Sequence, residues 1–517
     1  MMPFSVQAPT GFPADTWPAY AGDPMSIEPM PVPWMEHIPR HIPLTRGRQL
    51  FIDDYLIAST DLKRNFYSAV KFAGNPVLCP STPQELSPVT FPWMDEEKDE
   101  QALCYLGNGG IFFDAKKNRY NMFYTAGWRG GLAVAESTDM LNWTRSDIDG
   151  KGNILLAAGA NAAGFDNSIW LDNASSLDDE RIKYMVCRNG LAHTLSTSSD
   201  ARSWSQGVPT GPAGDYCSFF YNPFRNVWAY SIKQDGPRGR CRWYSESPDF
   251  LTGADWASRI YWTSADRYDL PDPAIGAQPQ LYHLNACAYE SIMIGMFMLH
   301  LGPENDVCVR EKRPKTTLLS LGFSRDGFHW HRPNRLPFIA ATHRDGDWDR
   351  DYLHSPTGMY AIYRDTLYFP YTGFSGMAPN GVRGMYCGAS IGIASLRRDG
   401  FASMDADGQG TLTTRPLIVS GHSLFVNTQC ETGSLRVAIC DEDGNEIPRY
   451  GKAVCDPISA DSTCHAVRWK ETRDVSAVSG EAIRLRFSLR NGKLFSFWVS
   501  SDEAGGSNGY YPSPFPV

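Results

Sequence analysis

The chain has 517 residues, a formal net charge of −9 and a hydrophobic content of 42%. This length exceeds that of one ordinary core and favours two domains. The sequence contains no cluster of Lys and Arg, which argues against a nucleic-acid partner because phosphate binding needs such clusters. No uninterrupted apolar stretch approaches ~18 residues, so the sequence predicts no transmembrane helix and no membrane partner.

The first segment, residues 1–48, holds ten prolines and little periodicity, and it predicts an irregular N-terminal arm. It has neither the basic segment nor the apolar run of a signal peptide. The sequence therefore predicts a cytoplasmic protein, although a secreted protein already trimmed of its signal would have the same pattern. The 12 cysteines are scattered, without a Cys-x-x-Cys pair. This favours buried free thiols over disulfides or a cysteine metal site.

From residue 49 to about 410, one outline recurs five times. A short alternating strand runs into a Ser-x-Asp or Arg-Asp-Gly turn, and the turn aspartates are Asp139, Asp200, Asp249, Asp326 and Asp399. Between these turns, Tyr-rich apolar runs alternate with polar turns, as in residues 109–127 and 358–374, which is typical of β-hairpins. A repeat of roughly 40–50 residues with insertions predicts a propeller of four-stranded sheets.

Towards the C-terminus, the pattern changes to longer alternating strands with Asp-Gly and Asn-Gly turns, as in residues 433–444 and 482–500. This pattern is typical of an antiparallel β-sandwich. The predicted fold class is therefore all-β. We expect a Pro-rich arm over 1–48, a five-bladed β-propeller over 49–412 and a C-terminal β-sandwich over 413–517.

Chemistry in such a propeller is expected in the axial funnel, where the innermost strands converge. Four acidic residues lie just before or inside the first apolar run of a repeat, and they are Asp166, Asp215, Glu290 and Asp351. Equivalent positions of radially arranged sheets point to one axis, so we expect these carboxylates to meet. Carboxylate pairs are what glycoside hydrolysis uses. The alternative is a turn cap for the aspartates and a structural salt bridge for Glu290.

Further polar and aromatic residues are candidates to bind a sugar. They are Asp53, Trp128, Arg188, His193, Trp243, His354 and Tyr371. For Asp53, which lies beside Asp54 in an apolar strand, a structural role is the alternative. The sequence lacks the usual motifs of nucleotide binding, zinc proteases and serine hydrolases. It therefore predicts neither a cofactor nor a metal ligand set, and a structural calcium stays open.

The phrases RQLFIDDYLI, AYES, RRDGFASMDA and GSLRVAICDEDG carry a family resemblance. With hairpins such as NRYNMFYTAG followed by AVAESTDMLNW, the chain resembles the five-bladed propellers of the β-fructosidase superfamily, which comprises glycoside hydrolase families 32, 43, 62 and 68. The resemblance covers nearly the whole chain beyond the arm. It implies a funnel with an Asp nucleophile or base, an Asp that stabilises the transition state and a Glu acid. By position, it makes Glu290 the acid, Asp166 the nucleophile or base, and Asp351 or Asp215 the third group.

The chain also departs from family 32, because the Trp-Met-Asn-Asp-Pro, Arg-Asp-Pro and Glu-Cys blocks are missing from their expected places. Sucrose or fructan hydrolysis is therefore not implied. The sequence predicts a glycoside hydrolase that cleaves a terminal sugar, such as an arabinofuranoside or fructofuranoside, from an oligosaccharide. A non-catalytic carbohydrate-binding propeller and a glycan phosphorylase or lyase on the same frame are the alternatives. The predicted partner is an oligosaccharide or glycoside; the linkage, the stereochemical outcome and a homo-oligomeric state stay open.

Overall fold

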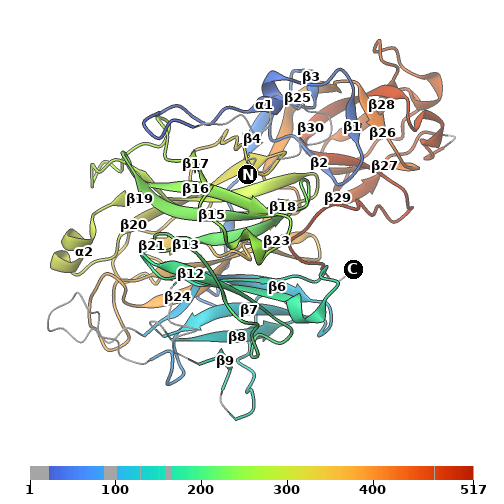
Figure 1. Ribbon diagram of the computed structural model, residues 1–517. Coiled ribbons are helices and arrows are strands. Elements are labelled where there is room, and N and C mark those ends of the chain that lie inside the picture. The colour runs from blue at the N-terminus through green and yellow to red at the C-terminus, as the bar shows by residue number, and fades with distance from the viewer. Residues whose placement is uncertain are drawn as a thin grey trace.

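The computed structural model describes residues 22–86, 102–127, 130–150, 152–157, 166–470 and 472–515. Strands dominate these ranges (Figure 1). The α-helices within them are short: α1 (Pro33–Glu36) and α2 (Asn305–Glu311). The prediction of an all-β chain is therefore confirmed in its general form.

An eight-stranded sheet follows the N-terminal region. One half contains β6 (Cys104–Asp114), β7 (Arg119–Ala126), β8 (Gly131–Ser137) and β9 (Ile154–Leu156). The other half contains β10 (Ser168–Leu171), β11 (Ile182–Val186), β12 (Ala192–Ser198) and β13 (Val208–Pro212). Each half is an antiparallel meander, and the strand pairing recorded between the halves is the parallel pairing of Ser168 in β10 with Asn108 in β6.

Three further sheets continue the chain. The first has β14 (Ser218–Asn222), β15 (Val227–Gly236), β16 (Gly239–Ser247) and β17 (Ile260–Thr263). The second has β18 (Gln280–Tyr289), β19 (Ile292–Gly302) and β20 (Thr316–Ser324). The third has β21 (Asp351–His354), β22 (Ala361–Tyr363), β23 (Thr366–Phe374), β24 (Ala389–Arg397) and β5 (Val70–Lys71).

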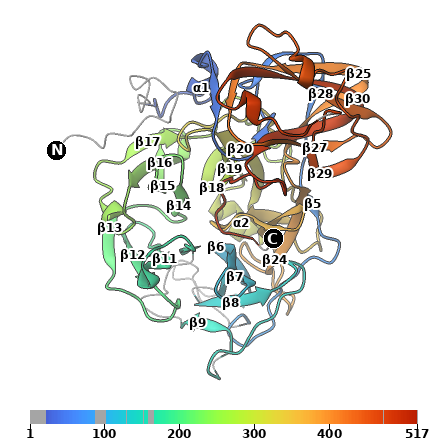
Figure 2. The ribbon, with the colours of Figure 1, turned by 90° about the vertical axis from the view of Figure 1, so that its right-hand side faces the viewer.

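These sheets follow one another around a ring, in a propeller-like arrangement (Figure 2). At the centre, Gly110 and Gly358 form a parallel bridge between the first and last sheets. A Cβ on Gly110 would lie 2.4 Å from the carbonyl oxygen of Gly358, so only glycine permits this approach. At the edge, β5 from the N-terminal region pairs with β24 of the last sheet. The ring is thus closed by segments far apart in the sequence.

The repeated Ser-x-Asp motif forms the same turn in successive sheets. The serine ends the third strand, and the aspartate Oδ1 accepts backbone N–H groups two or three residues later. This holds at Asp139, Asp200, Asp249 and Asp326. Such turns are what Asp side chains stabilise locally. The repeat visible in the sequence therefore reflects one local structure used in several sheets.

A ten-stranded sheet forms the C-terminal region (orange to red in Figure 1). Its later strands are β25 (Ala402–Thr414), β26 (Leu417–Val419), β27 (Ser423–Gln429), β28 (Ser434–Cys440), β29 (Asp461–Ala466) and β30 (Ala482–Ser500). Four N-terminal strands join them: β1 (Ile42–Leu44), β2 (Gln49–Leu50), β3 (Ile57–Thr60) and β4 (Lys63–Phe66).

The strand-like run that begins at residue 49 was expected to start the propeller, but the structure places residues 49–66 with the C-terminal sheet. Phe51 packs on Phe487 and Phe497 of β30, with ring centroids 6.2 and 5.7 Å away. Trp34 of α1 lies in the same core, fully buried. Local alternation predicts a strand but does not reveal its partner, because pairing depends on contacts distant in the sequence.

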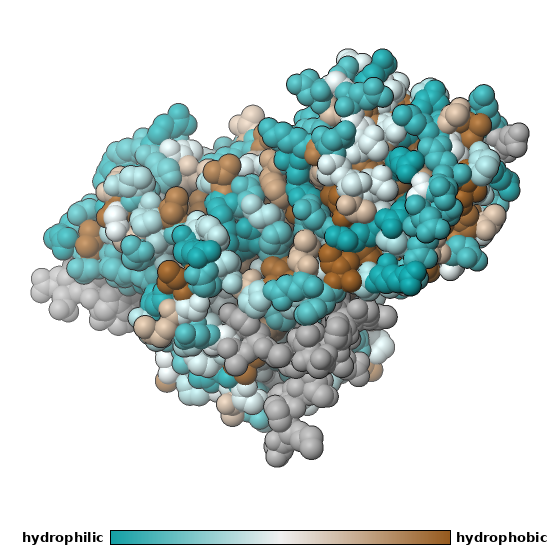
Figure 3. Space-filling model, turned by 90° about the horizontal axis from the view of Figure 1, so that it is seen from above, coloured by the Kyte–Doolittle hydropathy of each residue, from teal (hydrophilic) through white to brown (hydrophobic). Residues whose placement is uncertain are grey.

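The 12 cysteines are all free. Within the described ranges, no helix has the length and apolar character needed to span a membrane. The face shown in Figure 3 is mainly hydrophilic, and its hydrophobic residues form small separate patches among the coloured atoms.

Candidate functional site

Residues in or beside the inner strands of several sheets lie close together. Tyr105 lies in β6, Asp166 and Asp215 precede β10 and β14, and Tyr282 lies in β18. His354 ends β21. Hydrogen bonds join these separate sheets: Tyr105 to Asp166 at 2.8 Å, Tyr105 to His354 at 2.9 Å, and Tyr282 to Asp215 at 3.3 Å. We call these five residues, together with Tyr216, the funnel cluster.

Asp166 is the more buried carboxylate of the cluster, with 5% of its surface exposed. The Tyr105 hydroxyl donates to its Oδ1, and no cation of the described residues forms an ion pair with it. Burial, and then the nearby Asp215 carboxylate, raises the pKa of Asp166 to about 8. Asp166 is therefore protonated at neutral pH.

Asp215 has the opposite character. Its side chain is 30% exposed and forms an ion pair with Lys233, and Tyr282 donates to its Oδ2. Burial disfavours the charged form, but Lys233, Lys315 and Arg240 outweigh that effect and hold the pKa of Asp215 below its ordinary value. Asp215 is therefore an ionised carboxylate that solvent can reach.

Tyrosines form the wall beside this pair. The rings of Tyr216 and Tyr282 stack with centroids 5.4 Å apart. Arg242, fully buried beneath them, donates to the backbone carbonyls of Tyr216 at 3.1 Å and Tyr282 at 3.0 Å. Lys315 is 2% exposed, and its ammonium lies 5.2–5.6 Å from the ring centroids of Tyr282, Tyr352 and Tyr386. The wall is thus aromatic, rigidly held and positively charged.

Three of the sugar-binding residues predicted from the sequence belong to this region, and they are Arg188, His193 and His354. His354 is buried; burial, and then the charge of Lys315, holds its pKa well below its ordinary value, so the ring is neutral. Its Nδ1 faces the hydroxyls of Tyr105 and Tyr216. The Nε2 of His193 bonds the Gly214 carbonyl at 3.1 Å, and the Arg188 N–H donates to its Nδ1 at 3.1 Å.

His193 and Arg188 therefore act on the cluster through the backbone. Gly214 immediately precedes Asp215, and the amide of Asp215 donates to Asn189 Oδ1 at 3.1 Å. Burial, chiefly, lowers the pKa of His193 to about 4, so its ring is neutral at neutral pH. The turn between β11 and β12 thus fixes the position of Asp215.

Asp351 and Trp243 are near the cluster in sequence but face elsewhere. The Asp351 carboxylate contacts His343 Nδ1 at 2.8 Å and accepts from the Thr316 hydroxyl at 3.4 Å. Burial raises the pKa of Asp351, although His343 partly offsets this. Trp243 follows Arg242 in β16 and so points to the other face of the sheet, where it packs near Tyr261.

Glu290 does not meet the two aspartates, which corrects the expectation of a shared funnel. It follows β18, whereas Tyr282, which touches Asp215, lies near the start of that strand. Eight residues of strand separate the two positions by about 25 Å. Glu290 is fully buried and pairs with Arg48 at 3.3 Å and Arg398 at 3.1 Å. The alternative of a structural salt bridge describes this environment.

Asp53 and Tyr371 also lie away from the funnel cluster. Asp53 accepts from Trp34 Nε1 at 3.2 Å and pairs with Arg325 at 2.8 Å, a structural role that the sequence left open. Burial raises its pKa, but Arg325 outweighs this and the net pKa is lowered. The hydroxyl of Tyr371 donates to Asp349 at 3.0 Å. Trp128 lies outside the described residues.

Sequence reasoning missed the cations and most of the tyrosines of the site. Lys315 immediately precedes the apolar strand β20, and Tyr105 lies at the start of the apolar strand β6. A lysine or tyrosine at the entrance of a core strand is the available signal, but many such residues have structural roles. Lys233 lies inside β15, where nothing in the pattern distinguishes it.

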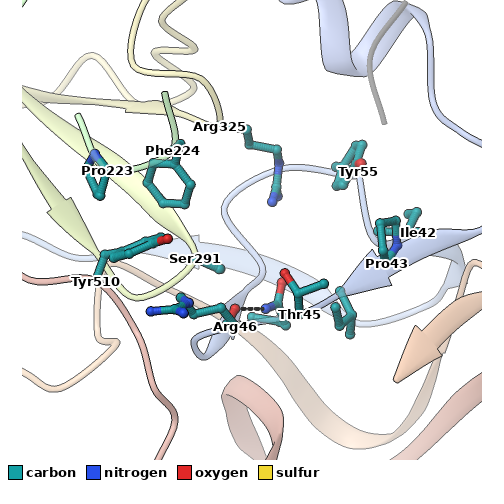
Figure 4. A pocket seen from close by; sticks show the side chains of 12 residues that line it. Ile42, Pro43, Thr45, Arg46, Tyr55, Pro223, Phe224, Ser291, Arg325 and Tyr510 are labelled. Carbon is teal, nitrogen blue, oxygen red and sulfur yellow. Dashed lines mark hydrogen bonds between the residues drawn. The ribbon is translucent and has the colours of Figure 1, made fainter. Parts of the chain in front are cut away.

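A separate cavity of about 230 Å³ lies between the N-terminal strands and the ring (Figure 4). It is lined by Arg46, Tyr55, Phe224, Ser291, Arg325, Tyr510 and neighbouring residues, and Gln49 donates to the Arg46 carbonyl at its edge. None of its lining residues is an Asp or Glu, and none is a sequence-predicted site residue. This cavity therefore offers no carboxylate for acid–base chemistry. Across the described ranges, no group of three or more His, Cys, Asp or Glu is arranged to hold a metal ion.

No protein-family model matches the chain, and no curated protein matches it. Solved structures do resemble it. A thermostable family-43 glycoside hydrolase is 12% identical, with 61% of this chain and 95% of that chain covered and a TM-score of 0.38. The Bombyx mori family-32 β-fructofuranosidase is 10% identical, with 80% and 93% covered and a TM-score of 0.35. The β-1,2-mannobiose phosphorylase from Listeria innocua is 10% identical, with 64% and 97% covered and a TM-score of 0.39.

By their descriptions, these structural neighbours are a family-43 glycoside hydrolase, a family-32 β-fructofuranosidase and a phosphorylase. Their TM-scores are too low to support an argument about activity. The functional conclusion therefore depends on the side chains of the funnel cluster.

Proposed function

We propose that the protein is a glycoside hydrolase in which Asp166 is the general acid and Asp215 is the base or nucleophile. The observation that supports this is the pair itself. The pKa of Asp166 is raised to about 8 and that of Asp215 is lowered, within one tyrosine-walled site. Two carboxyl groups whose environments separate their pKa values suit the two roles of glycoside hydrolysis.

The contacts suggest how each group would act. The Tyr105 hydroxyl occupies Oδ1 of Asp166, which leaves Oδ2 to carry the proton that the leaving glycosidic oxygen takes. Asp215, held by Lys233 and Tyr282, would attack the anomeric carbon or take a proton from the attacking water. In either course Asp166 loses one proton and the leaving group gains it. The separation of the reacting oxygens decides between retention and inversion.

The substrate that we propose is a terminal sugar of an oligosaccharide, and a furanoside is the specific candidate. The buried rings of Tyr282 and Tyr352 give the site an apolar wall with hydroxyls at its edge, which suits a sugar with C–H faces and polar edges. Of the sugar-binding residues predicted from the sequence, His354 remains the candidate within this site, where its Nδ1 contacts the hydroxyls of Tyr105 and Tyr216.

We also propose five blades and a C-terminal sandwich. The eight-stranded sheet would count as two blades, because its halves share only one parallel pairing. The remaining three sheets would supply the others. The division into arm, propeller and sandwich is kept as a proposal, with residues 42–66 assigned to the C-terminal unit because strands β1–β4 pair with it.

A panel of nitrophenyl glycosides that includes pyranosides and furanosides tests the proposal. We expect nitrophenol release from one sugar class, and release from furanosides would support the narrower candidate. Glycan binding without turnover of any glycoside or oligosaccharide would contradict the proposal and favour the non-catalytic alternative.

A further inference from the structure

Lys315 is a buried cation that forms no ion pair with any described residue. It is 2% exposed, and its ammonium has no hydrogen-bond or ion-pair partner within the part of the chain that the structure describes. Three tyrosine rings surround it at 5.2–5.6 Å. Burial, and then the charge of Arg240, lowers its pKa to about 8, so much of it is charged at neutral pH.

Two other cations of the wall, Lys233 and Arg240, have acidic partners, whereas Arg242 donates to backbone carbonyls. Lys233 pairs with Asp215, and Arg240 pairs with Glu304 at 3.2 Å. Because Asp166 is protonated at neutral pH, it does not neutralise the remaining charge. Among the described residues, Lys315 is therefore the cation of the wall whose charged group has neither a carboxylate nor a backbone carbonyl as partner.

An uncompensated buried charge is unfavourable unless something pairs with it. Cation–π contacts with the tyrosines offset only part of that cost. An oxyanion beside Lys315 would supply the missing charge. The Tyr282 hydroxyl already donates to Asp215, but the Tyr352 hydroxyl, 3.5 Å from it, can turn to donate a hydrogen bond to the anion.

We propose that Lys315 and its tyrosines bind an oxyanion that takes part in the reaction. The oxyanion is either the carboxylate of an acidic sugar or inorganic phosphate. The place of this anion beside Asp215 rests on the proposed function. With phosphate, a phosphate oxygen would bond to the anomeric carbon as the glycosidic bond breaks, Asp166 would protonate the leaving oxygen, and the phosphate proton would restore Asp166.

Calorimetric titration of the full-length protein distinguishes the sources. One arm uses inorganic phosphate. The other uses glucuronate and galacturonate, with glucose and galactose as neutral counterparts, all at ionic strength fixed with sodium chloride. We expect the wild type to bind one oxyanion class and not the neutral sugars. Lys315→Met should weaken that binding by about tenfold or more, and Lys315→Arg by less.

Lys71→Met is the matched control. Lys71 is also partly buried and lies 5.9 Å from a tyrosine ring, but it has a carboxylate partner, Asp349, and lies outside the funnel cluster. This variant should leave oxyanion binding unchanged. Because Lys315→Met removes no ion pair, its melting temperature should not fall. If the Lys315→Met protein fails to fold, two other measurements test the same charge. They are oxyanion binding by Lys315→Gln and the effect of salt on oxyanion binding by the wild type.

Three results would overturn the inference: no oxyanion binding by the wild type, equal binding of the neutral sugars, or binding that Lys315→Met does not weaken. Its failure is separable from that of the proposed function. Turnover of a neutral nitrophenyl glycoside without oxyanion binding would support the hydrolase proposal and contradict the oxyanion site. Lys315-dependent oxyanion binding without any glycoside turnover would support the oxyanion site and contradict the hydrolase proposal.

Discussion

The two ends of strand β18 carry acidic clusters of opposite electrostatic design. At its start, the pair Asp166 and Asp215 has one ion-pair partner, Lys233, and one member is held protonated. At its end, Glu290 and Asp399 are fully buried, and Arg48 lies within 3.3 Å and 2.9 Å of their respective carboxylates. Both clusters hold acids that flank apolar strands, and they differ in their ion pairs.

The second cluster joins the ring to the C-terminal sheet. Arg48 comes from the N-terminal strands, and Ser496 of β30 donates to Asp399 at 2.6 Å. Ser507 and Tyr511 from the C-terminal tail donate to Glu290, each at 2.7 Å. Every carboxylate oxygen there has a donor that favours its charged form. Burial of an acid therefore does not by itself indicate a catalytic role, and we propose that role for Asp166, whose carboxyl group has, among the described residues, only the Tyr105 hydroxyl as a hydrogen-bond donor.

The largest expected effect is loss of activity at the first cluster. Asp166→Asn and Asp215→Asn each remove an acid–base or nucleophilic group while preserving shape, so kcat/KM should fall by about 10²–10⁴-fold. The measurement is turnover of the best glycoside from the panel, with folding checked by circular dichroism. Near-wild-type activity in either folded variant would break the assignment of that residue.

The second cluster should respond through stability. Glu290→Gln leaves Arg48 and Arg398 without their shared counter-charge in a buried site, and losing one partner of such a group costs about 3–5 kcal/mol. We expect a lower urea midpoint and an unchanged kcat at temperatures where the variant is folded. A stable Glu290→Gln protein that has lost kcat would instead support the role of Glu290 as the acid that the family resemblance implies.

The pH profile should give the smallest effect and sharpen the comparison. The reaction needs Asp166 protonated and Asp215 ionised. Because the pKa of Asp166 is about 8, kcat/KM should be level below that pH and fall about tenfold per unit above it. Because the pKa of Asp215 is held below its ordinary value, the acidic limb should lie below about pH 4. The substrate should be neutral, so that the charge of Lys315 does not contribute to the pH dependence of kcat/KM. An alkaline limb near pH 5 would show that Asp166 is not held protonated.

Local pattern revealed a good part of the fold. The Ser-x-Asp turns could be predicted because each aspartate bonds amides only two or three residues away. The hairpins and the longer C-terminal strands follow from alternation in the same way. The partner of the strands in residues 49–66 could not be predicted, because Phe51 meets its partners in β30 more than four hundred residues later.

The sequence by itself determined that acids stand at the entrances of apolar strands, since residue type and alternation are local properties. It did not determine which acids share a site. Asp166 and Glu290 look alike in sequence, yet they lie at opposite ends of the inner strands, because the direction and length of β18 place them apart. Only the tertiary structure decided which carboxylate received Arg48 and Arg398 and which was left with a tyrosine hydroxyl. Protonation depends on such neighbours, and they come from distant parts of the chain.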